Sequence, residues 1–266
     1  MGCQVSVCII CCNEKQVITT CLDSVAWCSD IVVVDSGSTD GTFEAAAAHP
    51  TTPRIIHQQW LGYAAQRDFA IQQCLNDWVL ALDADEECSP QLAKQISALN
   101  ETSNSDVAMF SMPRRNYIAR RYVRCWSPDY QTRLLHKNRM TIAGNFVPEK
   151  RVAMPGFHIV KLTGPLLHNR LTAFQPSDFN DGPRMQEHAE LLAQSLAGKG
   201  QKANLLNLIF RPALTFLKYY ILRGGFLQGR FGLVIAYKTT IGVMLKYSVL
   251  YGKQEFEHAT HRKPPE

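Results

Sequence analysis

The stretch Trp78-Val79-Leu80-Ala81-Leu82-Asp83-Ala84-Asp85-Glu86-Glu87 runs from an apolar segment into a cluster of acids. Its apolar part has the length and composition of a strand buried on both faces of a sheet. In open parallel α/β sheets, ligands bind at the carboxyl ends of the strands, where Asp83 and Asp85 would lie. Two carboxylates there can hold Mg²⁺ or Mn²⁺ against a diphosphate. A solvated acidic turn that caps the next helix is the alternative interpretation.

Strand-like and helix-like patterns alternate four times around this stretch. The expected strands are Val5–Cys11, Ile31–Val34, Arg54–His57 and Trp78–Leu82, and the expected helices are Asn13–Val25, a segment ending near Ala48, Tyr63–Leu75 and a segment that starts at Ser89-Pro90. Such alternation predicts a doubly wound, mostly parallel sheet with right-handed crossovers. We also expect strands at Val107–Met112 and Gln131–His136.

The second expected strand also ends in a carboxylate, Asp35. It is followed by Ser36-Gly37-Ser38-Thr39-Asp40-Gly41-Thr42, a turn of small residues with side chains that cap helices. The glycine patterns of dinucleotide-binding folds, P-loop enzymes and hydrolase elbows are all absent. What remains, two strand ends with carboxylates and a small-residue turn, suits a nucleoside diphosphate bridged by a metal ion.

Composition and cysteine usage indicate a folded protein of a reducing compartment. The chain has 266 residues, of which 46% are hydrophobic and 19% charged, so it fits one large domain or one domain with an appendage. Its nine cysteines are odd in number and lie in the first half, several within apolar runs. Cys8 and Cys11 match a C-x-x-C pattern, but a strand would point them to opposite faces. The start, Met1–Gln4, lacks the basic region of a signal peptide.

The last third is basic and apolar. Beyond Ala197, eleven lysines and arginines face only three acids. Leu205–Leu222 and Phe226–Leu250 are long and apolar, but charged residues interrupt both, which suits helices lying in a membrane interface. A helical subdomain packed on the core is the alternative. We therefore expect a catalytic domain at 1–175, a basic helical membrane-interface region at 176–257 and a disordered tail at 258–266.

Two pairs of segments resemble a known family. Val32–Thr42 together with Leu82–Glu86 resembles family 2 glycosyltransferases of the GT-A fold. Trp60–Arg67 and Phe216–Phe226 resemble bacterial lipopolysaccharide core β-1,4-glucosyltransferases, and the likeness runs from about residue 5 to 251. The resemblance implies a GT-A type α/β fold with a C-terminal amphipathic helical region.

The same resemblance implies a function and a location. We expect inverting, Mg²⁺- or Mn²⁺-dependent transfer of a hexose, with glucose as the expected sugar, from a UDP-sugar. The expected acceptor is the lipopolysaccharide core or a similar lipid-linked glycan. The expected place is the cytoplasm, peripherally on the anionic inner face of the bacterial inner membrane, with no nucleic-acid partner.

Carried over by position, the resemblance also implies site residues. Asp35 would bind the uracil or ribose, Asp83 the ribose or metal, and Asp85 the metal that bridges the diphosphate. Arg67 would bind phosphate or orient the nucleotide, beside Gln66 as a further substrate-binding residue. His168 lies where such enzymes place a late metal ligand, although a core histidine would look the same. Family members usually have Asn in place of Asp68 and His-Glu in place of Pro148-Glu149.

The proton acceptor must come from elsewhere in the chain. An inverting displacement needs a carboxylate to accept the acceptor's proton, which contributes about 10²–10⁴-fold in rate, and a cation for the leaving diphosphate. Since the acids at the strand end are committed to the cation, we expect the base to be Glu149. A surface glutamate paired with Lys150 or Arg151 is the alternative. Arg133 is a candidate contact for acceptor phosphates, or a solvated surface arginine.

Two other classes of protein fit less well. A sugar nucleotidyltransferase would need a glycine-rich basic loop after the first strand, where this chain has Cys12-Asn13-Glu14-Lys15-Gln16. A non-catalytic binder of membranes or nucleic acid would suit the basic helices and the arginines and aromatics of Arg114–Trp126. Such a binder would not need acids at the strand ends.

Overall fold

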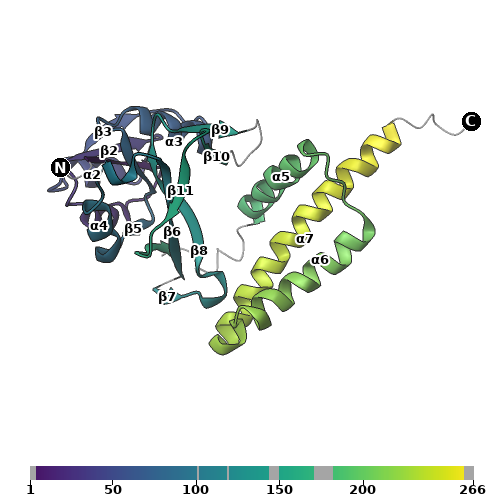
Figure 1. Ribbon diagram of the computed structural model, residues 1–266. Helices are drawn as coiled ribbons and strands as arrows, with labels where there is room; N and C mark the ends of the chain where they lie inside the picture. Colours follow the sequence, from purple (N-terminus) through teal and green to yellow (C-terminus); the bar gives the residue numbers. More distant parts are fainter. Residues whose placement is uncertain (1–3, 101, 119, 144–149, 171–181, 261–266) are drawn as a thin grey trace, which may run out of the picture. The chain divides into compact units, whose positions relative to one another are not determined.

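The computed structural model describes residues 4–100, 102–118, 120–143, 150–170 and 182–260. The chain separates into two compact units, each with its own interior (Figure 1). The α/β unit comprises Met1–Tyr122, Ser127–Gly144 and Glu149–Ala173. The helical unit comprises Val123–Trp126, Asn145–Pro148 and Phe174–Glu266.

The α/β unit is built on one large sheet. Along its main path the strands are β3 (Arg54–His57), β2 (Asp30–Asp35), β1 (Val5–Cys11), β4 (Trp78–Asp83), β8 (Asp129–His136), β6 (Val107–Ile118), β12 (Leu166–Arg170) and β5 (Glu86–Cys88). The first four are mutually parallel, and β8 runs antiparallel to both of its neighbours. Two more strands, β7 (Arg121–Tyr122) and β11 (His158–Lys161), pair with β6, and β9 (Met140–Ala143) pairs with β10 (Lys150–Ala153).

Helices cover both faces of this sheet. They are α1 (Ile18–Ser24), α2 (Thr42–Ala47), α3 (Tyr63–Gln72) and α4 (Pro90–Ser97), with a short 3₁₀ turn, η1 (Thr102–Asn104). One buried cluster joins Val7, Ile9 and Leu80 to α1 and α4, whereas Cys8, Ile10 and Val79 pack with α3. Successive residues of one strand therefore enter two different cores, as expected for a strand buried on both faces. The predicted α/β class with a largely parallel sheet is confirmed.

Cys8 and Cys11 lie in these two different cores, so the predicted opposite orientation of their side chains is confirmed. Every cysteine among the described residues is a free thiol. Burial raises the pKa of the Cys88 thiol to about 12, which keeps it neutral and unreactive. Apart from the exposed Cys12, the described cysteines are buried or half-buried and act as small apolar residues.

Some element bounds differ from the sequence-based ones. The first helix begins at Ile18 instead of Asn13, because Asn13 has a left-handed backbone with φ of 58° and cannot start a helix. Strand β6 continues past Met112 to Ile118, since β7 and β12 supply partners for its second half. Ser89 caps α4 as predicted, accepting a hydrogen bond from Leu92 N at 3.2 Å.

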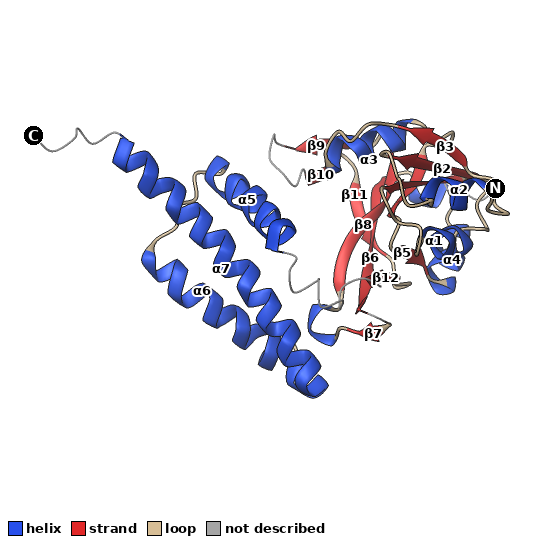
Figure 2. Cartoon of the chain, turned by 180° about the vertical axis from the view of Figure 1, so that it is seen from behind, coloured by secondary structure: helices blue, strands red, loops and turns tan. Residues whose placement is uncertain are grey.

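The helical unit consists of helices and helical turns (Figure 2). They are α5 (Gly182–Gly198), α6 (Leu205–Leu217), the π-helical turn η4 (Lys218–Leu222), the 3₁₀ turn η5 (Gly225–Gln228) and the long α7 (Gly229–Thr260). The 3₁₀ turn η2 (Arg124–Trp126) also belongs to this unit, although it lies between β7 and β8 in sequence. Trp126 Nε1 donates to Thr239 Oγ1 at 2.9 Å, and Arg223 Nη1 donates to Cys125 O at 3.3 Å. Helix α7 includes residues 258–260, which the sequence assigned to the tail.

Glycines allow α6 and α7 to meet in a tight hairpin. A Cβ on Gly232 would lie 1.8 Å from Gly225 O, a distance that no side chain tolerates. By length and composition alone, Leu205–Leu222 and Gly225–Phe256 are long and apolar enough to cross a membrane. Neither segment is charge-free: Arg211 and Lys218 interrupt the first, and Arg230, Lys238 and Lys246 interrupt the second, as the sequence indicated.

The first testable prediction concerns Gly164, which lies against the backbone of α4. A Cβ there would come within 2.5 Å of Leu92 N and Cα. Gly164→Ala should therefore lower the free energy of unfolding of the α/β unit by about 1–3 kcal/mol, measured by urea denaturation. Gly252→Ala is the matched control, since its Cβ would meet nothing within 4 Å. Equal stability of the two variants would contradict the packing.

Candidate active site

The carboxyl edge of strands β2, β1 and β4 brings the predicted acids together. Strand pairing aligns Cys11 with Asp35 on one side of β1 and Ile10 with Asp83 on the other. The two acids therefore flank β1 at a separation of two strand spacings, or about 10 Å. Such a span suits a nucleotide whose base lies at one acid and whose diphosphate lies at the other.

Asp35 fixes the turn that follows β2. Its carboxylate accepts hydrogen bonds from Gly37 N and Ser38 N, both at 3.0 Å, and from the Ser38 hydroxyl. Burial alone would raise the pKa of Asp35, but the hydrogen bonds from Ser38 and Gly37 outweigh it, so the pKa lies below its ordinary value. An ionised Asp35 therefore holds the turn in one conformation.

Asn13 joins this turn to the loop after β1. Its backbone N–H donates to Ser38 Oγ at 2.9 Å, and its side-chain Oδ1 accepts from Thr39 N at 2.8 Å. The left-handed backbone of Asn13 is the conformation that Asn adopts more readily than most residues. Asn13 was not among the predicted site residues, and only its position directly after a strand hinted at a structural role.

Gln66 is buried completely, so it supports the site from beneath its surface. Its Nε2 donates to Ser36 Oγ at 3.0 Å and to Gln58 O at 3.2 Å, and its Oε1 accepts from Leu61 N at 3.2 Å. Both ends of the amide are therefore used within the protein. The structure places Gln66 as a residue that positions the turns around Ser36 and Leu61.

Arg67, Asp83 and Arg133 are brought into one ion-pair network. Arg67 Nη2 and Arg133 Nη2 each contact one oxygen of the Asp83 carboxylate. Burial would raise the pKa of Asp83, but the charges of Arg133 and Arg67 outweigh it and hold the pKa far below its ordinary value. Asp83 is therefore ionised, and both of its oxygens are occupied by arginines.

Glu86 is the second acid of this network. It is fully buried, and its Oε1 accepts from Arg133 Nη2 at 2.7 Å and from Arg114 Nη1 at 3.0 Å. Its Oε2 accepts from Asp83 N at 3.2 Å. Arg133 is only 6% exposed, so it lies inside this network and does not reach out as a surface arginine would. No pattern around position 86 distinguishes Glu86 from a solvated acid of the same cluster.

Asp85 and His168 form a second pair beside the first network. His168 Nε2 lies 3.0 Å from Asp85 Oδ2, and His168 Nδ1 lies 2.8 Å from Asn116 Oδ1. If Nδ1–H donates to Asn116, Nε2 faces a carboxylate favourably only when a proton or a metal ion lies between them. Asn116 is thus a residue that orients the imidazole, as the partners of metal-bound histidines do.

A divalent ion fits this donor set. Mg²⁺ is commonly held by one or two carboxylates together with substrate phosphates and water. Within the described part of the chain, Asp85 and His168 provide two donors, and no group of three or more His, Cys, Asp or Glu side chains is assembled for a metal. The remaining ligands would have to come from the nucleotide and solvent.

A pocket of about 360 Å³ opens beside Asp85. It lies at the same edge of the α/β unit, and its lining residues are Val17, Thr20, Ala84, Asp85, Glu87, Tyr117, Arg120, Leu167 and Asn169. Asn169 also donates from Nδ2 to Glu87 Oε1 at 2.6 Å. The lining combines an aromatic ring, aliphatic side chains and charged groups.

Glu149, the predicted base, lies outside the described residues. Strand β10 begins directly after it, and Arg151 of this strand forms an ion pair with Asp68 of α3. This pair binds the β9–β10 hairpin to the helix that also carries Arg67. One alternative for Glu149, a salt bridge with Arg151, competes with this contact.

Comparison with known proteins adds a family and one full-length relative. The model described as Glycosyl transferase family 2 matches residues 6–156. The chain is 27% identical over 262 residues to the lipopolysaccharide core biosynthesis glycosyltransferase LpsC of Rhizobium meliloti, covering 91% of this chain and 92% of that protein. An uncharacterized glycosyltransferase of Rickettsia conorii is 39% identical over 104 residues, covering 39% of this chain and 36% of the relative.

Solved structures give weaker matches. S. aureus TarS in complex with UDP-GlcNAc matches with a TM-score of 0.48 and 15% identity, over 93% of this chain and 92% of that chain. Glucosyl-3-phosphoglycerate synthase from Mycobacterium tuberculosis, in complex with Mn²⁺, UDP and glucosyl-3-phosphoglycerate, has a TM-score of 0.44 and 16% identity, over 73% and 80% of the two chains. The family assignment rests on the sequence match.

The second prediction concerns the charge network. Asp83→Asn removes one of the two carboxylates that compensate Arg133, so it should cost about 1–3 kcal/mol at pH 7. Because the pKa of Asp83 is lowered by folding, its contribution is present above the unfolded pKa of about 4 and is lost as pH falls through the folded pKa. The difference between wild type and variant in urea denaturation should therefore narrow below about pH 4.

Asp106→Asn is the matched control for this measurement. The Asp106 side chain is 63% exposed and lies 3.6 Å from His158, so its loss should change stability little. A difference between wild type and Asp83→Asn that stays the same from pH 7 to pH 3 would contradict the ionised network.

Proposed function

Because the chain belongs to glycosyl transferase family 2, we propose that it transfers a hexose from a UDP-sugar to a glycan acceptor with inversion at the anomeric carbon. The observation that carries the proposal is the convergence of Asp35, Asp83 and the Asp85–His168 pair at one carboxyl edge of the sheet. Ligands of open α/β sheets bind at this edge.

The nucleotide would lie across β1, from Asp35 to Asp83. The turn that Asp35 fixes consists of small side chains, which leave space for a ribose and a base. Arg67 can offer a donor to a phosphate while it remains next to Asp83, since a guanidinium carries five donors and the Arg67 side chain is 18% exposed. Asp83 would thereby hold the Arg67 guanidinium in position for the diphosphate.

Asp85 and His168 would hold Mg²⁺ or Mn²⁺. When bound, the divalent ion supplies positive charge that stabilises the diphosphate as it leaves. Asn116 would keep the His168 ring oriented for this task, through the contact between its Oδ1 and His168 Nδ1. Asp83, with both oxygens on arginines, would then have a supporting role beside the metal.

Glu149 would be the general base. Its carboxylate would accept the proton of the acceptor hydroxyl while the hydroxyl oxygen forms a bond to the anomeric carbon. The bond from that carbon to the UDP oxygen breaks on the opposite face, and UDP leaves with the electron pair. The Arg151–Asp68 ion pair supports this role, because it fixes the strand that follows Glu149.

The acceptor would be the lipopolysaccharide core or a similar lipid-linked glycan, with glucose as the donor hexose. The likeness to LpsC over 91% of the chain supports this acceptor class. The basic, apolar helical unit supports a site of action at an anionic membrane surface, on the cytoplasmic face of the inner membrane.

The third prediction tests the metal. Purified protein should release UDP from a UDP-sugar only with Mg²⁺ or Mn²⁺, and Asp85→Ala should abolish release, measured by a coupled UDP assay. His168→Ala should raise the metal concentration needed for half-maximal release about 10–100-fold, as loss of a ligand or its partner does. Undiminished turnover in excess EDTA would refute the metal role.

The fourth prediction separates the base from the binding residues. Glu149→Gln should retain UDP binding, measured by calorimetry, and lose about 10²–10⁴-fold in transfer rate. Glu87→Gln is the matched control, because Glu87 lines the pocket beside Asp85 and accepts a hydrogen bond only from Asn169 among the contacts described above. Near-normal transfer by Glu149→Gln together with a large loss in Glu87→Gln would reassign the base to Glu87.

A further inference from the structure

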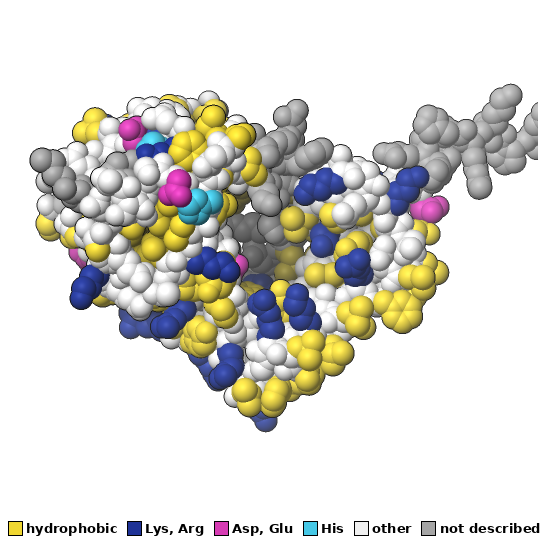
Figure 3. All heavy atoms as spheres, in the orientation of Figure 1, with side chains coloured by type: hydrophobic (Ala, Val, Ile, Leu, Met, Phe, Trp, Pro, Cys, Tyr) yellow, Lys and Arg dark blue, Asp and Glu magenta, His cyan; other side chains and the backbone are white. Residues whose placement is uncertain are grey.

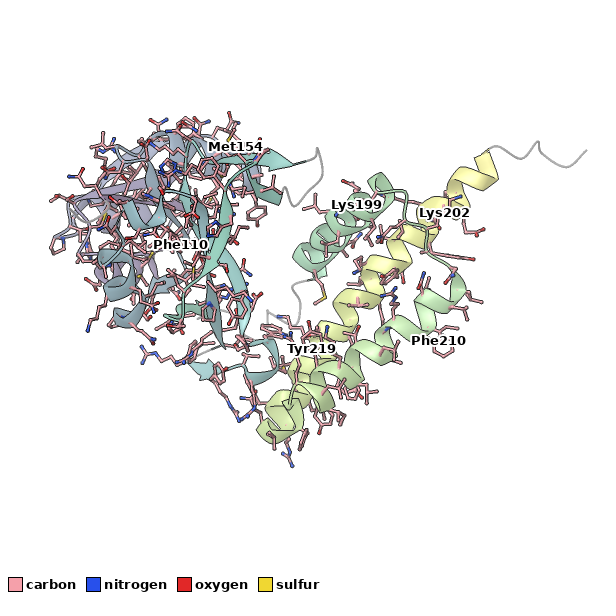
Figure 4. All side chains as sticks on the ribbon, in the orientation of Figure 1. Phe110, Met154, Lys199, Lys202, Phe210 and Tyr219 are labelled. Atoms are coloured by element: carbon pink, nitrogen blue, oxygen red, sulfur yellow. The ribbon has the colours of Figure 1, made fainter. Side chains whose placement is uncertain are left out.

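Helix α6 and the π-helical turn η4 that follows it expose an apolar stripe. Its members from Leu205 to Ile221 are linked by steps of three or four residues, which places them on one broad side of a helix. We define the α6 stripe as Leu205, Leu206, Ile209, Phe210, Leu214, Leu217, Ile221 and Leu222, all of which are 45–77% exposed. Phe210 and Tyr219 are labelled along this segment in Figure 4. Phe226 and Leu227 extend the apolar surface into the hairpin turn, at 48% and 60% exposure.

One side of α6 packs against α7, and the stripe is a separate, exposed side of the same helix. Phe216 contacts Tyr237 of α7 with ring centroids 5.1 Å apart, and Pro212 is buried. The stripe side chains are not part of these contacts and are 45–77% exposed. Eight large apolar side chains left open in this way are more than scattered surface residues, and they mark a site of interaction.

The charges around the stripe have one sign. From Leu191 to Gln254 the chain contains no aspartate or glutamate, and the same segment carries nine basic residues. Figure 3 shows lysine and arginine side chains next to the apolar surface of the helical unit. Arg211, Lys218 and Arg230 are exposed, and Lys218 lies 5.8 Å from the ring of Tyr219. The face therefore complements a partner that is apolar within and anionic at its surface.

We propose that the α6 stripe inserts in the plane of an anionic lipid bilayer, with the lysines and arginines of α6 and the hairpin at the phosphate level. Leucines and phenylalanine enter the boundary between head groups and acyl chains, and long basic side chains reach the head groups. Crossing the bilayer would instead draw Arg211, near the middle of Leu205–Leu222, into hydrocarbon, where a charged side chain is unfavourable.

The same charges disfavour a second copy of the chain as the partner. A symmetric dimer brings identical patches together, so the exposed Arg211 and Lys218 of one copy would face those of the other, and the sequence from Leu191 to Gln254 supplies no acid to compensate them. Lipid head groups supply the negative charge that such a dimer lacks. Binding through the stripe would hold the protein at the surface that carries a lipid-linked acceptor. Only this consequence rests on the proposed function.

The test uses the full chain and preformed vesicles that contain no lipopolysaccharide. Co-sedimentation should be strong with 30% phosphatidylglycerol in phosphatidylcholine and weak with phosphatidylcholine alone. Leu214→Glu with Leu217→Glu should lower the partition constant at least about tenfold, because each buried leucine contributes about 1.5–3 kcal/mol. Leu75→Glu is the matched control, since Leu75 is 76% exposed but lies in the α/β unit, and binding should be unchanged.

Charge and depth are measured separately. Lys218→Gln should lower binding to anionic vesicles about fivefold and leave binding to neutral ones unaltered. In a Phe210→Trp variant, bromines near the head-group end of the acyl chains should quench the added fluorescence more than bromines at the bilayer midplane. Stronger quenching at the midplane would overturn the in-plane arrangement.

Two further outcomes would overturn the proposal. One is equal binding of the stripe variant and Leu75→Glu. The other is a dimer in sedimentation velocity that the stripe variant converts to a monomer while vesicle binding is unchanged. UDP release from a UDP-sugar, measured in solution without vesicles, should be the same in the stripe variant as in wild type. If wild type bound vesicles but released no UDP from a UDP-sugar, the result would refute the proposed function and leave the membrane proposal standing.

Discussion

The carboxyl edge of the sheet depends on one carboxylate held by two arginines. Asp83 ends β4, Arg67 comes from α3, and Arg133 comes from β8, so one negative charge joins three elements. Arg133 is almost fully buried and always charged, and it must be compensated or the strand would not be stable there. Glu86 provides the second negative charge beneath it. The positions of both acids therefore follow from the need to neutralise a buried guanidinium.

This constraint divides the acidic cluster into two tasks. Asp83 and Glu86 are occupied by arginines, whereas Asp85 points to His168 and lines the pocket. The division supports a site in which Asp85 meets the cation and Asp83 keeps the arginines in place. It also explains how four acids can follow one strand closely, since each has its own cationic or hydrogen-bonding partner: His168 for Asp85, and Asn169 for Glu87.

The sequence predicted the elements that local pattern determines, and it missed the contacts that long-range packing determines. Strands β1 to β4, the Ser89 cap and the carboxylates at two strand ends all follow from runs of apolar residues and their boundaries. Arg133 was interpreted as a surface or acceptor-binding residue, because nothing around position 133 reveals that Glu86 and Asp83 lie beside it. Asn116 could not be linked to His168, since 52 residues separate them and pairing of β6 with β12 joins them.

Buried arginines are paired with acids in the α/β unit, whereas most of the helical unit has no acids in its sequence, and this difference bears on function. In the α/β unit the buried arginines are matched by acids within 3.0 Å, so the fold compensates itself. In the helical unit no acid lies between Leu191 and Gln254, and apolar side chains of α6 stay exposed. Both features cost free energy in water, from charge repulsion and from unburied apolar area. An anionic bilayer relieves both at once, whereas a polar protein partner relieves only the first. A transferase that acts on a lipid-linked sugar gains from this arrangement, because its acceptor is confined to the same surface.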